Sequence, residues 1–196
     1  LASVSPACGS CWWCLNGMSN HCDLGPKVRQ QPRFRLADGR QAPAVCGCGS
    51  FAEAMVADEA SVVAVETDLP DEELALIGCG VTTGLGAVFN SARVTPGASV
   101  AVIGCGGVDP AAERREASLR VGATHALDPA AADPVEHVRA LTSGRGADYT
   151  FEVVGRPELM VQAYEMARME GTVTLVGMPA VGETVTLPAV TAVFSG

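Results

Sequence analysis

The chain has 196 residues, of which 48% are hydrophobic and 18% are charged. This composition is typical of a globular chain with a buried core and excludes a disordered one. The 13 basic and 22 acidic residues leave a formal net charge of −9. Because no basic run interrupts this acidity, the sequence argues against nucleic acid as a partner.

The most apolar stretch, Leu74 to Phe89, is 16 residues long. A bilayer needs roughly 20 apolar residues, so we expect this stretch to lie in a core and expect no membrane partner. No charged and then apolar leader opens the chain, which favours a cytoplasmic protein. In a chain of this kind, eight cysteines favour metal binding or catalysis over disulfide bonds.

Residues 1–50 are rich in Gly, Pro, Cys and Asn, and this predicts a loop-dominated segment. Residues 51–56 and 62–65 follow as predicted short strands, and residues 70–76 open a predicted helix with an acidic first turn. Beyond Gly97, strands and helices alternate. The predicted strands are residues 99–103, 125–127, 149–154 and 172–176, and the predicted helices are residues 111–120, 134–141 and 158–169. Apolar strands separated by helices indicate an α/β fold with a doubly wound parallel sheet, covered on both faces.

Four cysteines near the N-terminus have the spacing C-x2-C-x2-C-x7-C: Cys8, Cys11, Cys14 and Cys22. Four thiolates this close in sequence can form a tetrahedron around Zn²⁺, and Gly9 and Gly17 permit the tight turns that it needs. An all-sulfur shell selects zinc over calcium or magnesium. Such a closed shell predicts a structural site; two local disulfides or four free thiols are the alternatives.

The predicted strand 99–103 runs into a glycine loop, Gly104-Cys105-Gly106-Gly107-Val108. Dinucleotide-binding folds begin in this way, with a first glycine that makes the turn and a second that lets a pyrophosphate approach the backbone. Asp109 stands where a third glycine is expected. An ordinary strand–helix turn is the alternative, but the alternation that follows favours nucleotide binding.

Together these features resemble the zinc-dependent alcohol dehydrogenases of the medium-chain dehydrogenase/reductase superfamily, along nearly the whole chain. The similarity rests on the four-cysteine motif, on LIGCGVTTG at residues 76–84, on VTPG at residues 94–97 before the glycine loop, and on FEVVGR at residues 151–156. Among the subgroups, the chain most resembles the class III-like enzymes, which include glutathione- or mycothiol-dependent formaldehyde dehydrogenases.

The resemblance implies two domains. Residues 1–80 correspond to the loop-rich zinc lobe and part of a β-rich catalytic domain, and residues 81–196 to an incomplete, Rossmann-type NAD-binding domain. Zinc and NAD are the implied cofactors, with hydride transfer from a zinc-bound alkoxide to NAD⁺. Cys79 matches a ligand of the catalytic zinc, and Thr83 matches a residue beside the nicotinamide.

The same resemblance assigns the cofactor-binding residues. The pyrophosphate loop corresponds to Gly104, Gly106, Gly107 and Val108. Asp109 matches a carboxylate that binds the adenosine ribose and favours NAD over NADP, with Arg114 as the basic residue nearby. The strand ends that line the cofactor crevice correspond to Val153, Val176 and Met178.

Three departures from the family pattern shape the expected function. Two further catalytic-zinc ligands, a Cys and a His, lack counterparts, about 20 residues are missing after Val108, and the chain stops at Gly196 before the last strands. We therefore expect an internally deleted fragment with little or no dehydrogenase activity.

The implied partners are a small alcohol or aldehyde, including a thiol–formaldehyde adduct, and further copies in a homo-oligomer. A non-enzymatic zinc-stabilised module and a polyol dehydrogenase relative are the alternatives.

Overall fold

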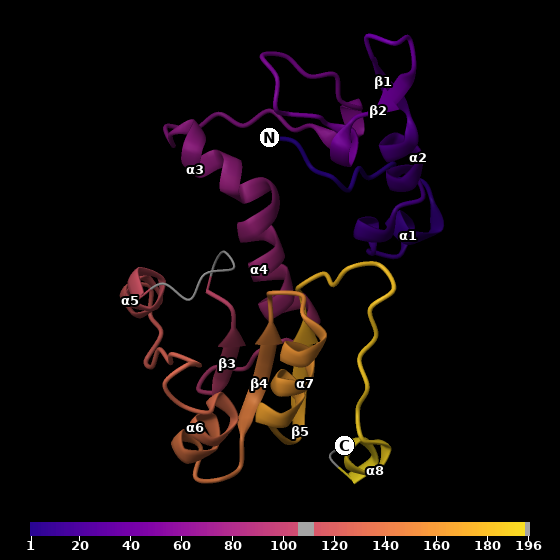
Figure 1. The fold of residues 1–196 in the computed structure, drawn as a ribbon. Coiled ribbons are helices and arrows are strands. Elements are labelled where there is room, and N and C mark those ends of the chain that lie inside the picture. Colours follow the sequence, from indigo (N-terminus) through magenta and orange to yellow (C-terminus); the bar gives the residue numbers. More distant parts are fainter. Residues whose placement is uncertain (106–111, 195–196) are drawn as a thin grey trace. The chain divides into compact units, whose positions relative to one another are not determined.

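A computed structural model describes residues 1–105 and 112–194 of the chain (Figure 1). The chain forms two compact units, a first unit of Leu1–Thr82 and a second unit of Thr83–Gly196. The boundary between them falls two residues beyond the predicted division at residue 80. The assignment of the units as catalytic and nucleotide-binding domains stays a prediction.

The first unit consists mostly of loops, as its composition predicts. Its short elements are α1 (Trp12–Leu15), η1 (Ser19–His21), α2 (Leu24–Gln30), the antiparallel pair β1 (Pro32–Arg35) and β2 (Gln41–Pro43), η2 (Val45–Gly47) and η3 (Glu59–Ser61). Five buried apolar side chains form its small core: Pro6, Cys22, Val28, Ala44 and Cys48. A core of this size leaves the unit in need of another stabilising element.

The two strands predicted for residues 51–56 and 62–65 are wrong. Residues 51–56 form bends and loop, and Val62 makes a single antiparallel bridge to Ala2. An apolar run becomes a strand when a neighbouring strand accepts its backbone hydrogen bonds. The described part of the chain supplies no such ladder for either segment.

Helical structure extends from Asp71 to Ser91. It comprises α3 (Asp71–Leu76), the π-helical η4 (Ile77–Val81), α4 (Thr82–Gly86) and the π-helical η5 (Ala87–Ser91). The helix predicted to open at residues 70–76 is confirmed, but the prediction that Leu74–Phe89 lies in a core is wrong. None of these helical residues is buried, because burial needs packed neighbours that an apolar sequence does not itself provide.

By length and composition, Asp71–Ser91 is also the one helix among the described residues that could cross a membrane. It has 21 residues and a mean hydropathy of 1.4. Core helices of soluble proteins pass the same test, so this finding is weak support for a membrane span. The predictions of a cytoplasmic location and of no membrane partner therefore stay predictions.

The second unit is an α/β structure with a parallel sheet, as predicted, and the sheet has three described strands where four were expected (Figure 1). The sheet has the order β3 (Val100–Ile103), β4 (Ala147–Glu152), β5 (Ala167–Leu175), and the helices are α5 (Ala112–Arg120), α6 (Pro134–Leu141), α7 (Pro157–Met166) and α8 (Ala189–Phe194). β3, β4, α5 and α6 were predicted to within two residues. β5 begins five residues before its predicted start, so the last three residues of the helix predicted at 158–169 belong to the strand and α7 ends at Met166.

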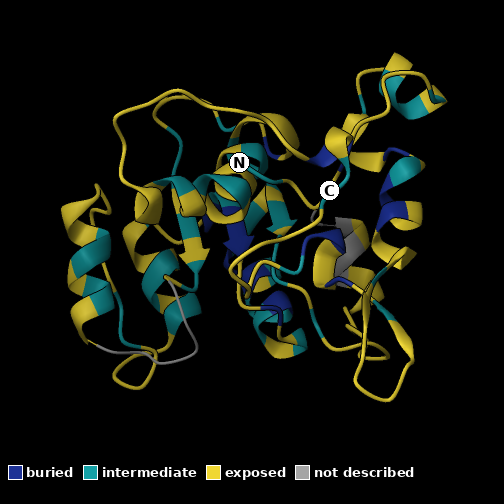
Figure 2. Cartoon of the chain, turned by 90° about the horizontal axis from the view of Figure 1, so that it is seen from above, coloured by how far each residue is buried: buried dark blue, intermediate teal, exposed yellow. Residues whose placement is uncertain are grey.

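The core of the second unit lies where α7 packs against the sheet. Met160, Ala163 and Met166 of α7 are buried, as is Phe151 of β4. Figure 2 colours the buried residues of the chain dark blue. Val100 and Val102 of β3, by contrast, are 47% and 59% exposed. The expectation of a sheet covered on both faces is therefore wrong at β3, because the described helices leave one face of this strand open.

The predicted strand at residues 125–127 is also wrong, since this segment is an extended loop. No described strand pairs with it, and β3 pairs only with β4 in the sheet. Without a partner ladder, the short apolar run has no means of becoming a strand.

Candidate functional site

The four N-terminal cysteines converge in the first unit, where their Sγ atoms all lie within 4.8 Å of one another. We call Cys8, Cys11, Cys14 and Cys22 the four-cysteine cluster. The Sγ atoms of Cys11 and Cys22 are 3.8 Å apart. A tetrahedron with Zn–S bonds of about 2.3 Å has S···S edges of about 3.8 Å. Both the chemistry and the spacing of this donor set therefore fit a zinc ion.

Local backbone geometry brings these sulfur atoms together. Gly9 and Gly17 both have positive φ, +71° and +76°, as tight turns between the cysteines require. The one-turn helix α1 lies between these turns and carries Cys14. The indole of Trp13 then contacts the His21 ring, with centroids 5.4 Å apart, which ties α1 to the segment before Cys22. The predicted role of the two glycines is thus consistent with the structure.

Hydrogen bonds to sulfur favour thiolates in part of the cluster. The hydroxyl and N–H of Ser10 lower the pKa of Cys8 to about 6. Desolvation raises the pKa of Cys14 to about 12, and the neighbouring thiols of the cluster add to this rise. Four thiolates at this spacing repel one another, so a cation is needed before all four can ionise. Metal binding here is therefore coupled to proton release.

The two residues predicted for catalysis are both exposed. Cys79 lies in η4 of the first unit, and Thr83 lies in α4 of the second. Among the described residues, the four-cysteine cluster is the group of potential ligands that could hold a metal, and Cys79 is not part of it. The structure therefore brings the four cysteines together and brings no further potential ligand group to Cys79 among the described residues. The structural and catalytic roles of these cysteines stay predictions.

The predicted cofactor residues of the strand ends meet at one edge of the sheet, which we call the carboxyl edge. Gly104, Val153 and Val176 each follow the last residues of β3, β4 and β5. The Val153 N–H donates to the carbonyl of Ile103 at 3.0 Å, and the Val176 N–H donates to that of Glu152 at 2.8 Å. These bonds align the three strand ends, as ligand sites in open parallel sheets require.

Gly104 makes the turn that the glycine loop predicts. Its φ is +102°, and a Cβ at this position would lie 2.7 Å from Cγ2 of Val154. Any larger residue would therefore both strain the backbone and clash with the β4 loop. The remaining loop residues, Gly106, Gly107, Val108 and Asp109, lie outside the described residues.

The other predicted cofactor residues differ in exposure. Val153 is 39% exposed and Met178 is 88% exposed, whereas Val176 is half-buried. Arg114 is half-buried in α5 and already has an interaction partner. The role of each residue towards a cofactor stays a prediction.

Sequence reasoning missed Glu152, whose side chain is fully buried at the end of β4. Its Oε1 accepts hydrogen bonds from the N–H groups of Val154 and Gly155 at 2.9 and 2.8 Å. The signal was present within FEVVGR, where a carboxylate stands between the apolar residues Phe151 and Val153 of a predicted strand. A buried acid in such a strand indicates a specific hydrogen-bonding role.

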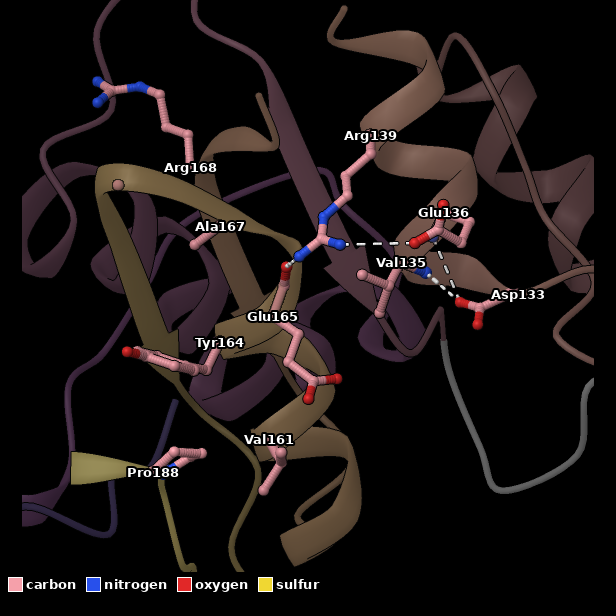
Figure 3. A pocket seen from close by; sticks show the side chains of 11 residues that line it. Asp133, Val135, Glu136, Arg139, Val161, Tyr164, Glu165, Ala167, Arg168 and Pro188 are labelled. Atoms are coloured by element: carbon pink, nitrogen blue, oxygen red, sulfur yellow. Dashed lines mark hydrogen bonds and ion pairs between the residues drawn. The ribbon is translucent and has the colours of Figure 1, made fainter. Parts of the chain in front are cut away.

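A pocket of about 450 Å³ lies elsewhere in the second unit, between α6, α7 and the start of β5 (Figure 3). Arg139 points across it, donates to the carbonyl of Glu165 at 3.2 Å and pairs with Glu136 at 3.5 Å. None of the predicted site residues lines this pocket. We interpret it as a groove bridged by helix–helix contacts rather than as the predicted cofactor crevice.

Comparison with known proteins adds independent findings. The model of the zinc-binding dehydrogenase family matches residues 84–195. S-(hydroxymethyl)glutathione dehydrogenase of Synechocystis sp. is 32% identical over 203 residues, which cover 90% of this chain and 55% of that protein. Geraniol dehydrogenase of Castellaniella defragrans is 35% identical over 203 residues, covering 89% and 54%. The chain thus spans about half the length of these relatives.

Solved structures agree in fold. The alcohol dehydrogenase zinc-binding domain protein from Burkholderia ambifaria superposes with a TM-score of 0.84 at 28% identity, over 100% of this chain and 60% of that one. Benzyl alcohol dehydrogenase from Acinetobacter calcoaceticus gives a TM-score of 0.84 at 26% identity, over 100% and 59%. These similarities confirm the predicted α/β fold as a part of a longer one.

Proposed function

The chain belongs to the zinc-binding dehydrogenase family, whose model matches 112 of its 196 residues (84–195), and we propose that it carries the structural-zinc lobe and part of the NAD-binding domain of an alcohol dehydrogenase. The observation that carries this proposal is the convergence of four sulfur atoms within 4.8 Å. A zinc-free member of the family would have no need of such a cluster.

In this proposal the four-cysteine cluster holds a structural zinc, because four protein ligands leave no open position for a substrate. The bound metal would add the stabilisation that the small core of the first unit does not supply. Ser10 and the backbone N–H groups of Cys8 and Cys11 stabilise the thiolates through bonds of 3.3 to 3.5 Å to sulfur.

The proposed NAD site is the carboxyl edge of the second unit. Gly104 lets the backbone turn beneath a pyrophosphate, and Val153 and Val176 form apolar walls beside it. We propose further that Asp109 binds the adenosine ribose, which favours NAD over NADP. NAD⁺ bound at this edge would supply the acceptor for a hydride from an alcohol.

The proposed substrate class is an alcohol or aldehyde. One relative is named for S-(hydroxymethyl)glutathione and another for geraniol, so a thiol–formaldehyde adduct is one proposal within that class. We propose Cys79 as a ligand of the catalytic zinc and Thr83 as a residue beside the nicotinamide, because the family resemblance implies these roles. A homo-oligomer is proposed on the same basis.

We nevertheless expect little or no turnover by these 196 residues alone. A catalytic zinc normally has three protein ligands, and among the described residues Cys79 belongs to no potential metal-binding group. The chain would then act as a zinc-stabilised nucleotide-binding module. NADH formed from a primary alcohol by the pure chain would contradict this expectation.

Zinc content is the first test. Elemental analysis of the purified chain is expected to give about one zinc per chain, and Cys8→Ser and Cys11→Ser should each lower this value towards zero. Cys46→Ser is the matched control, because Cys46 is an exposed thiol outside the cluster. A chain without zinc would contradict the proposed metal site, and about two zinc ions per chain would indicate that Cys79 has found other ligands.

Binding of the cofactor is the second test. Titration calorimetry with NADH is expected to show saturable binding, and Gly104→Val should abolish it, since a Cβ there meets Val154 at 2.7 Å. Gly122→Ala is a control, because Gly122 also has positive φ, +110°, but has open space at its Cβ position. Equal NADH binding by all three chains would show that the carboxyl edge is not the site.

A further inference from the structure

The carboxyl edge contains a buried acid to which the proposed chemistry assigns no role. Glu152 ends β4, the middle strand of the sheet, and its side chain is fully buried. Acidic side chains are almost never fully buried unless they are paired. Since the removal of a charge from water is costly, a specific interaction must offset the burial of Glu152.

That interaction is with the loop that follows β4. Oε1 of Glu152 accepts hydrogen bonds from the N–H of Val154 at 2.9 Å and from the N–H of Gly155 at 2.8 Å. Oε2 is buried and has no hydrogen-bond partner among the described residues. The described side-chain hydrogen bonds of Glu152 are therefore both made to this one loop.

The loop in turn touches both neighbouring strand ends. A Cβ on Gly104 would lie 2.7 Å from Cγ2 of Val154, and a Cβ on Gly177 would lie 2.0 Å from the backbone nitrogen of Gly155. Gly155 itself has a φ of +89°, a conformation that most residues avoid. Any movement of the loop would therefore displace the turn after β3 and the segment after β5.

We propose that Glu152 is a positioning residue of the nucleotide crevice. Its carboxylate holds the backbone of Val154 and Gly155, and through them the turn at Gly104, in the shape that receives a dinucleotide. This inference rests on the proposed function, because it takes the carboxyl edge as the NAD site. Glu152 does not touch the cofactor, since its side chain is fully buried.

Backbone hydrogen exchange tests the hold on the loop directly. Glu152→Ala removes the acceptor, so exchange of the Val154 and Gly155 amides should rise roughly tenfold or more. Exchange in the middle of β4, at Thr150 and Phe151, should change much less. In Glu152→Gln the amide oxygen can still accept both bonds, and exchange should stay close to that of the unaltered chain.

NADH affinity, measured by calorimetry, tests the consequence for binding. Glu152→Ala should weaken it by roughly tenfold, whereas Glu152→Gln should restore it to within about threefold. Met160→Ala is the control for lost stability alone, because Met160 is a buried residue of α7 that makes none of the loop's hydrogen bonds. It should lower the unfolding midpoint and leave NADH affinity unchanged.

Two results would overturn the inference. One is unaltered exchange of the Val154 and Gly155 amides in Glu152→Ala; the other is a loss of NADH affinity in Met160→Ala equal to that in Glu152→Ala. An unaltered chain that binds no NADH would contradict the proposed function and the cofactor part of this inference with it. In that case the exchange measurement still decides whether Glu152 holds the loop, so the two failures are distinguishable.

Discussion

Asp148 connects the amino ends of all three strands of the sheet. Its Oδ2 accepts hydrogen bonds from the backbone N–H and the hydroxyl of Ser99, at 2.8 and 2.7 Å, and its Oδ1 accepts one from Nε of Arg168 at 2.6 Å. Ser99 precedes β3, Asp148 lies in β4, and Arg168 lies in β5. Sequence reasoning did not find this contact, because the three residues are far apart in the chain.

The pH dependence of the free energy of unfolding should reveal the contribution of the Asp148 carboxylate. Arg168, followed by Ser99, holds the pKa of Asp148 well below its usual range. The stabilisation of the fold by ionised Asp148 is therefore complete above the pKa of an unfolded Asp, about 3.9, and is lost as pH falls towards the pKa of Asp148 in the folded chain. Asp148→Asn should lower the urea midpoint of unfolding at neutral pH. Because the variant has no carboxylate to protonate, its urea midpoint should fall less steeply than that of the unaltered chain below about pH 4.

Glu136→Gln is the matched control for this prediction. Glu136 also pairs with an arginine, Arg139, but the Glu136 side chain is 72% exposed and the contact is 3.5 Å. Exposed pairs contribute little to stability. If Asp148→Asn and Glu136→Gln gave the same midpoints across the pH range, the role assigned to Asp148 would be wrong.

At the scale of the element, α6 shows how completely local signals can define a helix. Its N-cap, Asp133, accepts hydrogen bonds from the N–H groups of Val135 and Glu136 at 2.8 and 3.3 Å. Pro134 occupies the first turn, where its missing N–H costs nothing. The predicted range, residues 134–141, is confirmed residue by residue because these signals require no distant partner.

Replacement of this cap should destabilise the second unit. Asp133→Ala is expected to cost about 1 kcal/mol of unfolding free energy, measured as a lower urea midpoint with an unchanged slope. Asp133→Ser should recover most of the loss, since serine is also a favoured N-cap. A Ser variant as unstable as the Ala variant would show that the carboxylate acts through something other than the cap.

At the scale of the whole molecule, the two units have different sources of stability. The second unit has a parallel sheet and a covering helix, whereas the first unit has five buried apolar side chains and consists mostly of loops. Structural zinc contributes folding free energy directly, about 10–16 kcal/mol in small zinc domains. We therefore expect the first unit to depend on its metal and the second to fold without it.

Chelation of zinc should affect the stability of the first unit and not that of the second. Treatment with EDTA is expected to remove hydrogen-exchange protection from residues 1–82 while β4 and α7 keep theirs. Cys14→Ser should have the same effect without a chelator. Protection of β1 and β2 that persisted after complete loss of zinc would contradict a metal-dependent first unit.

Several features were determined by the sequence alone, because they depend on neighbours in the chain. Three features depend on residues that are close together in the sequence: the four-cysteine cluster, the turn at Gly104 and the N-cap of α6. The positions of the parallel strands β3, β4 and β5 were also predictable from their apolar residues. Only β3 is continuously apolar, the pattern expected of a parallel sheet, whereas polar residues alternate with the apolar ones in β4 and β5.

Tertiary structure alone decided which apolar segments are strands and which are buried. Residues 51–56 and 125–127 have strand-like sequences, yet they find no ladder partner among the described residues and remain loop or bend. The helical stretch from Asp71 to Ser91 is apolar, yet nothing in the described chain buries it. In the sequence, Glu152 is a polar residue within a predicted strand. Only the structure shows that its side chain accepts hydrogen bonds from the loop after β4. Pairing and burial are properties of two surfaces in contact, and a sequence pattern specifies only one of them.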